Sequence, residues 1–384
     1  MADAGALPPT LPRLHEPGVY LDLPMQDYVD DPAISGSGLK KLLTSPSDFK
    51  WELPNRNPLF TAPESDARAL GTMVHCAVLE GMDAFHHNFF VAPALDDEDP
   101  RVMRTADQAK NWLKDRGEKC TGLKADLFER VRACAEIMRL EGAAEDELPI
   151  FLDQLIADLT AQGNGRRVKI KQRDFDYVAQ VERVVRSWPD ARQLLSGGLP
   201  EVSIFWVENG IRFKARLDYL SALAIVDLKK FGLPPIRGQS LRTYLQFEAV
   251  KYCYDIQAVH NSRATMQIPL LLKGDGITSA TGAGASDRLA LLEQIGAEIL
   301  RQPPTFHWLF LRTPGPPQGL VMPFPAESRR WSHCESDIEE ALRNLAAYRD
   351  QCGDELDAAK PWIEVGVAEW DDDDLREYHW EIAR

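Results

Sequence analysis

The dipeptide Asn209-Gly210 constrains the fold most, because it stands between two runs of alternating apolar and polar residues. Asn-Gly accepts the positive φ angles of a two-residue hairpin turn, so the flanking runs are predicted to pair as antiparallel strands. Counting outward from the turn pairs Trp206 with Phe213, and the alternate positions continue as one apolar face. The sequence therefore predicts a long hairpin over residues 201–218 with one face packed on a core.

The same register places Glu201 directly opposite Asp218 on the other face of the hairpin. Like charges at opposed positions repel, and a divalent cation between them is the usual reason to keep such a pair. The next predicted strand, Ala224 to Lys229, carries Asp227 and Lys229 two residues apart, so both side chains point to one face. Three carboxylates and one lysine are thus predicted to converge.

This combination suits metal-assisted cleavage of a phosphodiester. Carboxylates hold one or two magnesium ions, which activate water and neutralise charge on the phosphate. The lysine orients that water or stabilises the developing oxyanion as a point charge. Taken singly, each of the four residues is more often a solvated charge on a strand, so the prediction rests on the combination.

Composition sets limits on partners and compartment. The net charge of −15 weighs against a general DNA-coating protein, although it leaves room for an enzyme with a basic groove. No apolar run reaches the ~20 residues of a membrane helix, and the N-terminus lacks the pattern of a signal peptide. We therefore expect a cytoplasmic protein with no membrane partner.

The six cysteines are scattered, with no close-set C-x-x-C pair. This spacing argues against a zinc knuckle and against an iron–sulfur cluster, and it favours reduced thiols.

Along the chain, residues 1–17 are rich in proline and are expected to be flexible. Residues 18–384 are expected to form a single domain, with a largely helical insertion at about 100–196. The densest basic run lies inside that insertion and is either a solvated loop or a grip on the phosphate backbone of DNA. Its basic residues are Arg166, Arg167, Lys169, Lys171 and Arg173.

Three further residues are candidates that depend on their surroundings. His75 lies on a predicted helix over 67–80, where a histidine is more often part of the core than a metal ligand. Gln257 lies on a predicted helix over 240–263, where a glutamine is usually an ordinary polar residue. Arg216, which pairs with Ser203 on the hairpin face of the acidic residues, is a weaker candidate for DNA contact.

In these stretches the chain resembles the RecE-like family, the nuclease domain of exonuclease VIII, within the PD-(D/E)XK superfamily. The resemblance rests on ISGSGLKKLLTSPSDFKW, ALGTMVHCAVLE, EVSIFWVENGIRFKARLDYLSALAIVDLKK and YCYDIQAVHN, in that order. It implies an α/β fold with a PD-(D/E)XK nuclease core, in which a central mixed β-sheet is flanked by helices and carries helical insertions.

The resemblance also implies roles for residues of this sequence. Lys229 would be the catalytic lysine, and Gln257 would support the site or contact DNA. One departure is Asn261, which stands where the family's Gln-x-x-x-Tyr motif has its tyrosine. The metal ligands would be His75, Glu201, Asp218, Asp227 and the backbone carbonyl of Leu228.

The implied activity is that of a Mg²⁺-dependent exodeoxyribonuclease, with Mn²⁺ as a substitute, which degrades linear duplex DNA from its ends, 5′→3′, by a two-metal-type mechanism. The implied setting is phage-type recombination, with a ring-shaped homo-oligomer and a single-strand annealing protein as partner. Three alternatives stay open. They are an endonuclease of the same superfamily in defence or restriction, a non-catalytic DNA-binding module of the same fold, and a carboxylate–metal hydrolase with a non-nucleic substrate.

Overall fold

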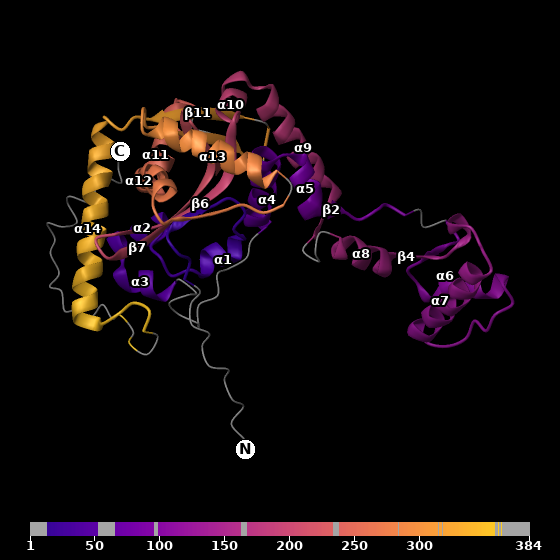
Figure 1. Cartoon of the computed structure of the whole chain (residues 1–384). Helices are drawn as coiled ribbons and strands as arrows, with labels where there is room; N and C mark the ends of the chain where they lie inside the picture. The colour runs from indigo at the N-terminus through magenta and orange to yellow at the C-terminus, as the bar shows by residue number, and fades with distance from the viewer. Residues whose placement is uncertain are drawn as a thin grey trace, which may run out of the picture. The chain divides into compact units, whose positions relative to one another are not determined.

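The computed structural model describes residues 14–52, 66–95, 99–162, 167–232, 238–282, 284–313, 315–316, 318–357, 360 and 362. It shows an α/β protein whose central mixed sheet is flanked by helices, as the sequence predicted (Figure 1). The chain separates into two compact units. The first comprises Met1–Glu64, Leu194–Arg312 and Gly319–Arg384, and the second comprises Ser65–Gln193 and Thr313–Gln318.

The first unit contains a seven-stranded sheet in the order β11-β10-β8-β7-β6-β1-β9. Most neighbours are antiparallel, but β10 runs parallel to β8 and β1 runs parallel to β9, so the sheet is mixed. The strands are β1 (Gly18–Tyr20), β6 (Gly198–Glu208), β7 (Ile211–Ser221), β8 (Ala224–Phe231), β9 (Ile277–Ser279), β10 (Thr305–Arg312) and β11 (Gly319–Phe324).

The predicted hairpin is confirmed in its register. Strands β6 and β7 pair Trp206 with Phe213 and continue to Val202 with Leu217. Asn209 and Gly210 have φ angles of 51° and 77°, the left-handed values that a type I′ turn requires. The turn chemistry and the alternation together fix which face of the hairpin packs on the core.

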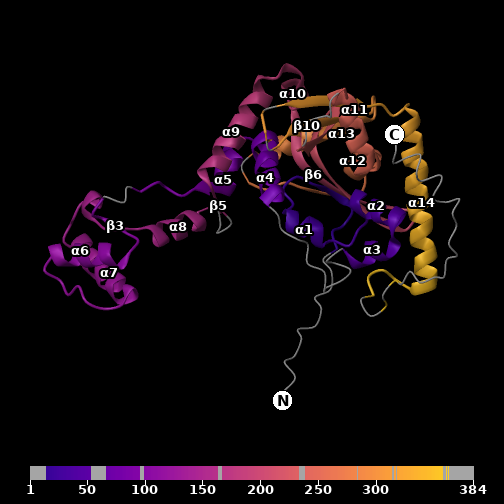
Figure 2. The same ribbon diagram turned by 180° about the vertical axis from the view of Figure 1, so that it is seen from behind.

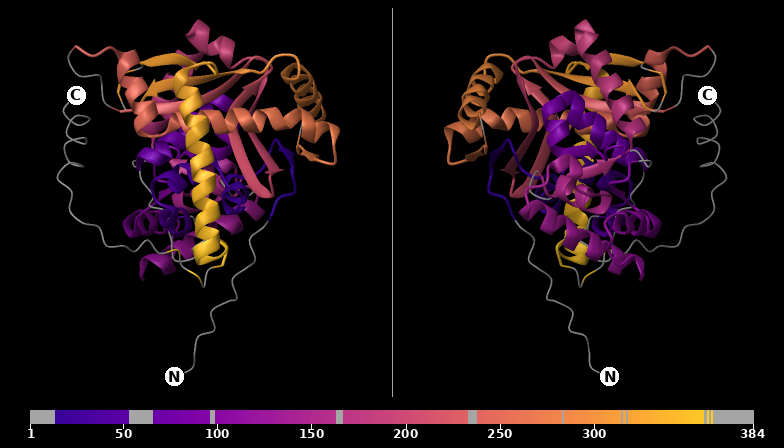
Figure 3. Two further views of the ribbon diagram at one scale, coloured as in Figure 1. Left: turned by 90° about the vertical axis from the view of Figure 1, so that its left-hand side faces the viewer. Right: turned by 90° about the vertical axis from the view of Figure 1, so that its right-hand side faces the viewer.

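Helices cover the apolar face of this sheet. Helix α12 (Tyr254–Lys273) lies against β6 and β7, and α14 (Arg329–Cys352) packs on α12 and on α2 (Gly36–Thr44), as Figure 3 shows. Helix α14 buries a stripe at the helical repeat: Trp331, Cys334, Ile338, Ala341 and Leu345. The other helices of this unit are α1 (Met25–Asp30), α3 (Pro46–Trp51), α11 (Leu241–Lys251) and α13 (Ala285–Ile299).

The second unit is mostly helical, with two pairs of short strands. Figure 2 shows α6 (Ala106–Asp115) near α7 (Lys124–Leu140), and the two helices share a small apolar core. The expected division into one domain with an insertion remains a prediction. The remaining elements are α4 (Asp66–His75), η1 (Cys76–Glu80), α5 (Met82–Asn88), β2 (Phe89–Val91), β3 (Val102–Met103), η2 (Glu145–Glu147), β4 (Ile150–Phe151), α8 (Leu152–Ala161), β5 (Val168–Ile170), α9 (Gln172–Ser187) and α10 (Pro189–Leu194).

The second face of the β6–β7 hairpin is also buried. Phe205 packs on the rings of His15, Tyr20 and Tyr28. Of the segment expected to be flexible, residues 1–13 lie outside the described residues, whereas His15 is buried. This face therefore adds to the core of the first unit instead of facing solvent.

Lys214 on this face closes the end of α1. Its ammonium group donates to the backbone carbonyls of Tyr28 at 2.6 Å and Asp31 at 2.5 Å. A cation at the C-terminus of a helix satisfies carbonyls that have no partner inside the helix and interacts favourably with the helix dipole. Lys214 therefore ties β7 to the chain that precedes α2.

None of the helices in the described part of the chain is both long and apolar enough to cross a lipid bilayer.

Replacing Lys214 with methionine should destabilise the first unit by about 2 kcal/mol, because hydrogen bonds from a charged donor contribute roughly 1.5–3 kcal/mol. The free energy of unfolding in urea would measure the loss. The matched control is Lys251→Met on α11, whose side chain is 65% exposed and should change stability by less than about 0.5 kcal/mol. Equal effects of the two substitutions would contradict the role of Lys214.

Candidate active site

Asp227 and Lys229 lie on the core face of β8. They share this face with Ile225 and Phe231, which belong to the main apolar core. Asp227 is 2% exposed, and its Oδ2 lies 2.6 Å from Nζ of Lys229. The Asp-x-Lys spacing predicted that both side chains share one face of the strand, and they do. That this face belongs to the apolar core, and that the two groups form an ion pair there, was not predicted.

Gln257 from α12 connects the two members of this pair. Its Nε2 donates to Oδ1 of Asp227 and its Oε1 accepts from Nζ of Lys229, both at 3.4 Å. Gly36 of α2 permits this packing, because an added Cβ there would lie 3.3 Å from Cγ of Gln257. The structure therefore brings together Asp227, Lys229 and Gln257, three residues that the sequence singled out.

The ladder between β7 and β8 stops at the acidic residues. The two strands pair Leu220 with Ile225 and Tyr219 with Val226, and the next opposed position would be Asp218 with Asp227. The carboxylate of Asp218 instead accepts the backbone N–H of Leu228 at 2.7 Å. A side chain thus replaces a backbone acceptor here, and this contact fixes the orientation of Asp218.

A second interruption occurs at Glu201. The β6–β7 register is the same on both sides, yet no pair forms where Glu201 opposes Asp218. Glu201 has a φ of 53°, a left-handed conformation that is unfavourable for a residue with a Cβ. The apolar alternation slips there, since the core residues Leu199 and Val202 are three positions apart. Even so, the carboxylates of Glu201 and Asp218 offer oxygens within 4.8 Å of each other.

Arg216 holds Glu201 in place. Its Nε donates to Oε2 of Glu201 at 2.6 Å, and its Nη1 donates to the carbonyl of Leu23 at 2.7 Å. Arg216 and Glu201 are 13% and 17% exposed. The expected contact of Arg216 with DNA remains a prediction, whereas the structure shows this guanidinium orienting an acidic residue of the site.

The charge of Lys229 is set by two opposing effects. Burial alone would lower its pKa, but the carboxylates of Asp227 and Asp218 outweigh burial and raise the pKa above the ordinary lysine value. The Nζ of Lys229 also lies 4.9 Å from the ring centroid of Tyr254, the first residue of α12. Lys229 is therefore a positively charged group at neutral pH.

A second lysine beside the site was missed from the sequence. Lys40 of α2 lies 5.3 Å from the ring centroid of Tyr254 and donates to the carbonyl of Tyr252 at 3.1 Å. Burial, and then the charge of Lys229, lower the pKa of Lys40 to about 8. Its position in the SGSGLKKLL stretch was the available signal, but helical spacing alone did not show that it faces α12.

Two neighbours of Gln257 on α12 are buried. His260 is neutral, because burial lowers its pKa to about 4, and its Nε2 lies 2.9 Å from the carbonyl of Lys214. Asn261, at the position of the family tyrosine, is 3% exposed. These residues support the helix that carries Gln257.

The donor set of the first unit fits a hard divalent cation. Glu201 and Asp218 offer oxygens within 4.8 Å of each other, and carboxylate oxygens are the ligands that Mg²⁺ prefers. The role of Asp227 as a third ligand remains a prediction. His75 ends α4 in the second unit, and its role as a ligand remains a prediction. The same holds for the backbone carbonyl of Leu228.

The predicted basic segment belongs to the second unit. Arg166 lies outside the described residues, and Arg167 donates to Oε1 of Gln162 and stacks near Phe90. Lys169, Lys171 and Arg173 are exposed. The contact of this segment with DNA remains a prediction. Arg167 has a structural role in addition.

No protein-family model matches this sequence, and no curated protein matches it. Among solved structures, a similar chain is a "Putative exonuclease" from Eubacterium rectale, with a TM-score of 0.42 and 12% identity over 85% of this chain and 87% of that chain. Similarity this low assigns neither a family nor an activity.

The Glu201→Gly variant should have a free energy of unfolding about 1 kcal/mol higher than the Glu201→Ala variant. Both variants lack the carboxylate, but glycine adopts left-handed φ angles without strain. The free energies of unfolding of Glu201→Gly and Glu201→Ala would test this. The control pair is Val207→Gly and Val207→Ala on the same strand, where alanine should be the more stable residue. The same order at both positions would contradict the strain at Glu201.

Asp227→Asn and Lys229→Met should each destabilise the chain by about 3 kcal/mol, since either change leaves one partner of a buried pair alone. The double variant should lose less than the sum, with a coupling of at least about 1 kcal/mol. Because the pKa of Lys229 is raised, its contribution is present below pH 10.5 and is lost as the pH rises through the raised value. Urea unfolding in chelator would measure the cycle, and additive losses would contradict a coupled pair.

Proposed function

We propose that this protein is a metal-dependent DNA nuclease of the RecE-like type. One observation carries the proposal: a buried Asp227–Lys229 pair, joined by Gln257, lies beside the carboxylates of two neighbouring strands. A buried ion pair is expensive, and its arrangement next to further acidic groups is typical of a site that binds a cation and a phosphate.

In the proposed reaction, the carboxylates and the lysine have different roles. Glu201, Asp218 and Asp227 would hold one or two Mg²⁺ ions, and Mn²⁺ has similar ligand preferences. Bound Mg²⁺ supplies activation of water and neutralisation of charge on the phosphate. Lys229 is charged and is held by Asp227 and Gln257, so it stabilises negative charge on the phosphate without reorganising.

The finer features of the proposal rest on the family resemblance. They are exonucleolytic degradation of linear duplex DNA, 5′→3′ polarity, a ring-shaped homo-oligomer, a single-strand annealing protein as partner, and phage-type recombination in the cytoplasm. The net charge of −15 adds one physical expectation, which is that DNA binding depends on local contacts at the site more than on long-range attraction.

The test is digestion of a linear duplex and a matched closed circle, with Mg²⁺ or with chelator. The linear form should disappear with Mg²⁺ only, and Asp218→Asn should lower the rate at least about 100-fold, because the amide keeps an acceptor for the Leu228 N–H but loses the charge. End-labelled substrates would then give the polarity.

The matched control is Asp287→Asn, an exposed aspartate of α13, which should leave the rate unchanged. Cutting of the circle would replace the proposal with an endonuclease. Failure to cut either substrate would favour a DNA-binding module or a hydrolase for another substrate.

A further inference from the structure

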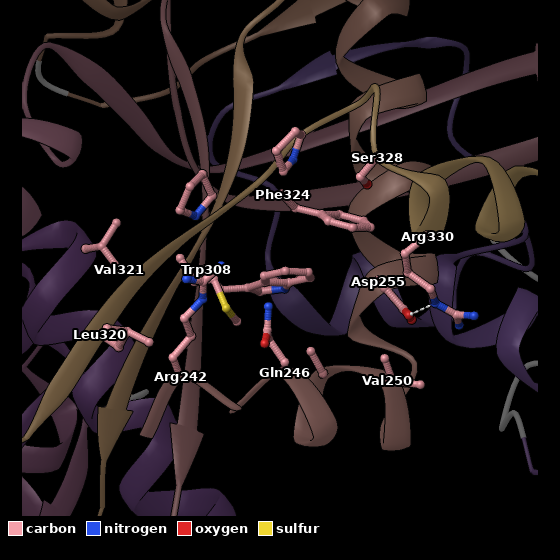
Figure 4. A pocket seen from close by; sticks show the side chains of 14 residues that line it. Arg242, Gln246, Val250, Asp255, Trp308, Leu320, Val321, Phe324, Ser328 and Arg330 are labelled. Carbon is pink, nitrogen blue, oxygen red and sulfur yellow. Dashed lines mark hydrogen bonds and ion pairs between the residues drawn. The ribbon is translucent and has the colours of Figure 1, made fainter. Parts of the chain in front are cut away.

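A groove of about 790 Å³ opens between α11, the start of α12, the edge strand β11 and its neighbour β10 (Figure 4). Its walls are apolar, and polar groups stand at separate points along it. Ligand sites commonly have this size and this composition. The apolar wall is formed by Val250, Trp308, Leu320, Met322, Phe324 and Pro325.

The groove begins next to the candidate active site. Trp308 of β10 is the register partner of Asp227 on β8, so the two residues are neighbours in the sheet. On the opposite wall, Asp255 lines the groove, while the preceding residue, Tyr254, contacts Lys229. The floor and one wall of the groove are therefore continuous with the elements that hold the ion pair.

The groove offers a hydrogen-bond donor that has no acceptor in the described part of the chain. The indole N–H of Trp308 is buried without a partner, and the residue is 3% exposed. A buried donor left unpaired costs free energy, so a bound acceptor would satisfy it. Arg242 lines the groove from α11, and its exposed side chain adds a positive charge.

The one carboxylate in the groove is already neutralised. Asp255 is buried, and its Oδ2 accepts from Nε of Arg330 at 2.6 Å. This end of the groove is thus an ion pair rather than a free anion, and Nη2 of Arg330 also lies 3.9 Å from Oδ2 of Asp337. Apolar walls with arginines along them complement a chain that carries flat bases and phosphates.

We propose that this groove binds a short unpaired segment of the DNA strand whose phosphodiester lies at Asp227 and Lys229. Bases lie against the apolar wall, a base or phosphate oxygen accepts from the indole N–H of Trp308, and Arg242 contacts a phosphate. This inference rests on the proposed nuclease function, because it places the groove next to the reacting phosphate.

The test measures the affinity of the full chain for a short fluorescently labelled oligothymidylate by anisotropy, in chelator so that no cleavage occurs. Arg242→Ala and Trp308→Phe should each weaken binding about 10-fold, since each removes one donor to the strand. Trp308→Phe keeps a ring in the core, and Arg242→Ala changes an exposed residue, so at least one variant reports on a folded chain. The matched control, Arg301→Ala, removes an exposed arginine at the end of α13 and should leave affinity unchanged.

Unchanged affinity in both groove variants overturns the inference. The inference is also overturned if the groove variants change the oligomeric state in sedimentation but keep their affinity for the oligonucleotide. The groove would then be covered by a second copy of the chain. The two proposals fail separately. If the groove variants weaken oligonucleotide binding but the protein never cuts DNA, only the nuclease function is overturned. If the protein cuts DNA and the variants bind unchanged, only the role of the groove is overturned.

Discussion

The buried pair of Asp227 and Lys229 is the interaction on which the rest of the site depends. Both groups share their face of β8 with the core residues Ile225 and Phe231, so they are largely removed from water and each depends on the other. Packing Gln257 against them gives each partner a further hydrogen bond. An apolar pair at the same positions would cost less desolvation, so stability alone does not account for the choice of residues.

The regular pairing of the strands is interrupted where the carboxylates would oppose one another. Register alone would place Glu201, Asp218 and Asp227 in a row across three strands, with like charges at opposed positions. The ladder opens at both contacts: Glu201 turns to a left-handed φ, and Asp218 takes the N–H of Leu228. Strained backbone and side chains that replace ladder bonds concentrate at functional sites, where surrounding contacts enforce them. Here Arg216 supplies such a contact for Glu201.

The sequence predicted the parts of the site that obey short-range rules. Asn-Gly and period-two alternation determine the hairpin register, and Asp-x-Lys determines a shared face, so these relations needed no tertiary information. The approach of Gln257 was predicted through the family resemblance, while the contact itself depends on how α2 and α12 pack at Gly36. The left-handed Glu201 and the position of Lys40 could not be predicted, because both arise from contacts between segments distant in sequence.

The positively charged side chains near the site are likewise held by contacts inside the chain. Two cations that the sequence offered for DNA are engaged inside the chain: Arg216 with Glu201 and Leu23, and Arg167 with Gln162. Lys214 closes α1 instead of facing solvent. With a net charge of −15, a diffuse positive surface is not the means by which this chain would attract a phosphate backbone. Cations held at fixed positions, Lys229 and Lys40 around the ring of Tyr254, act only over short distances. Under the proposed function, such a site would select for a phosphate that is already positioned, and the adjoining groove, with its apolar wall and buried indole N–H, would place the strand.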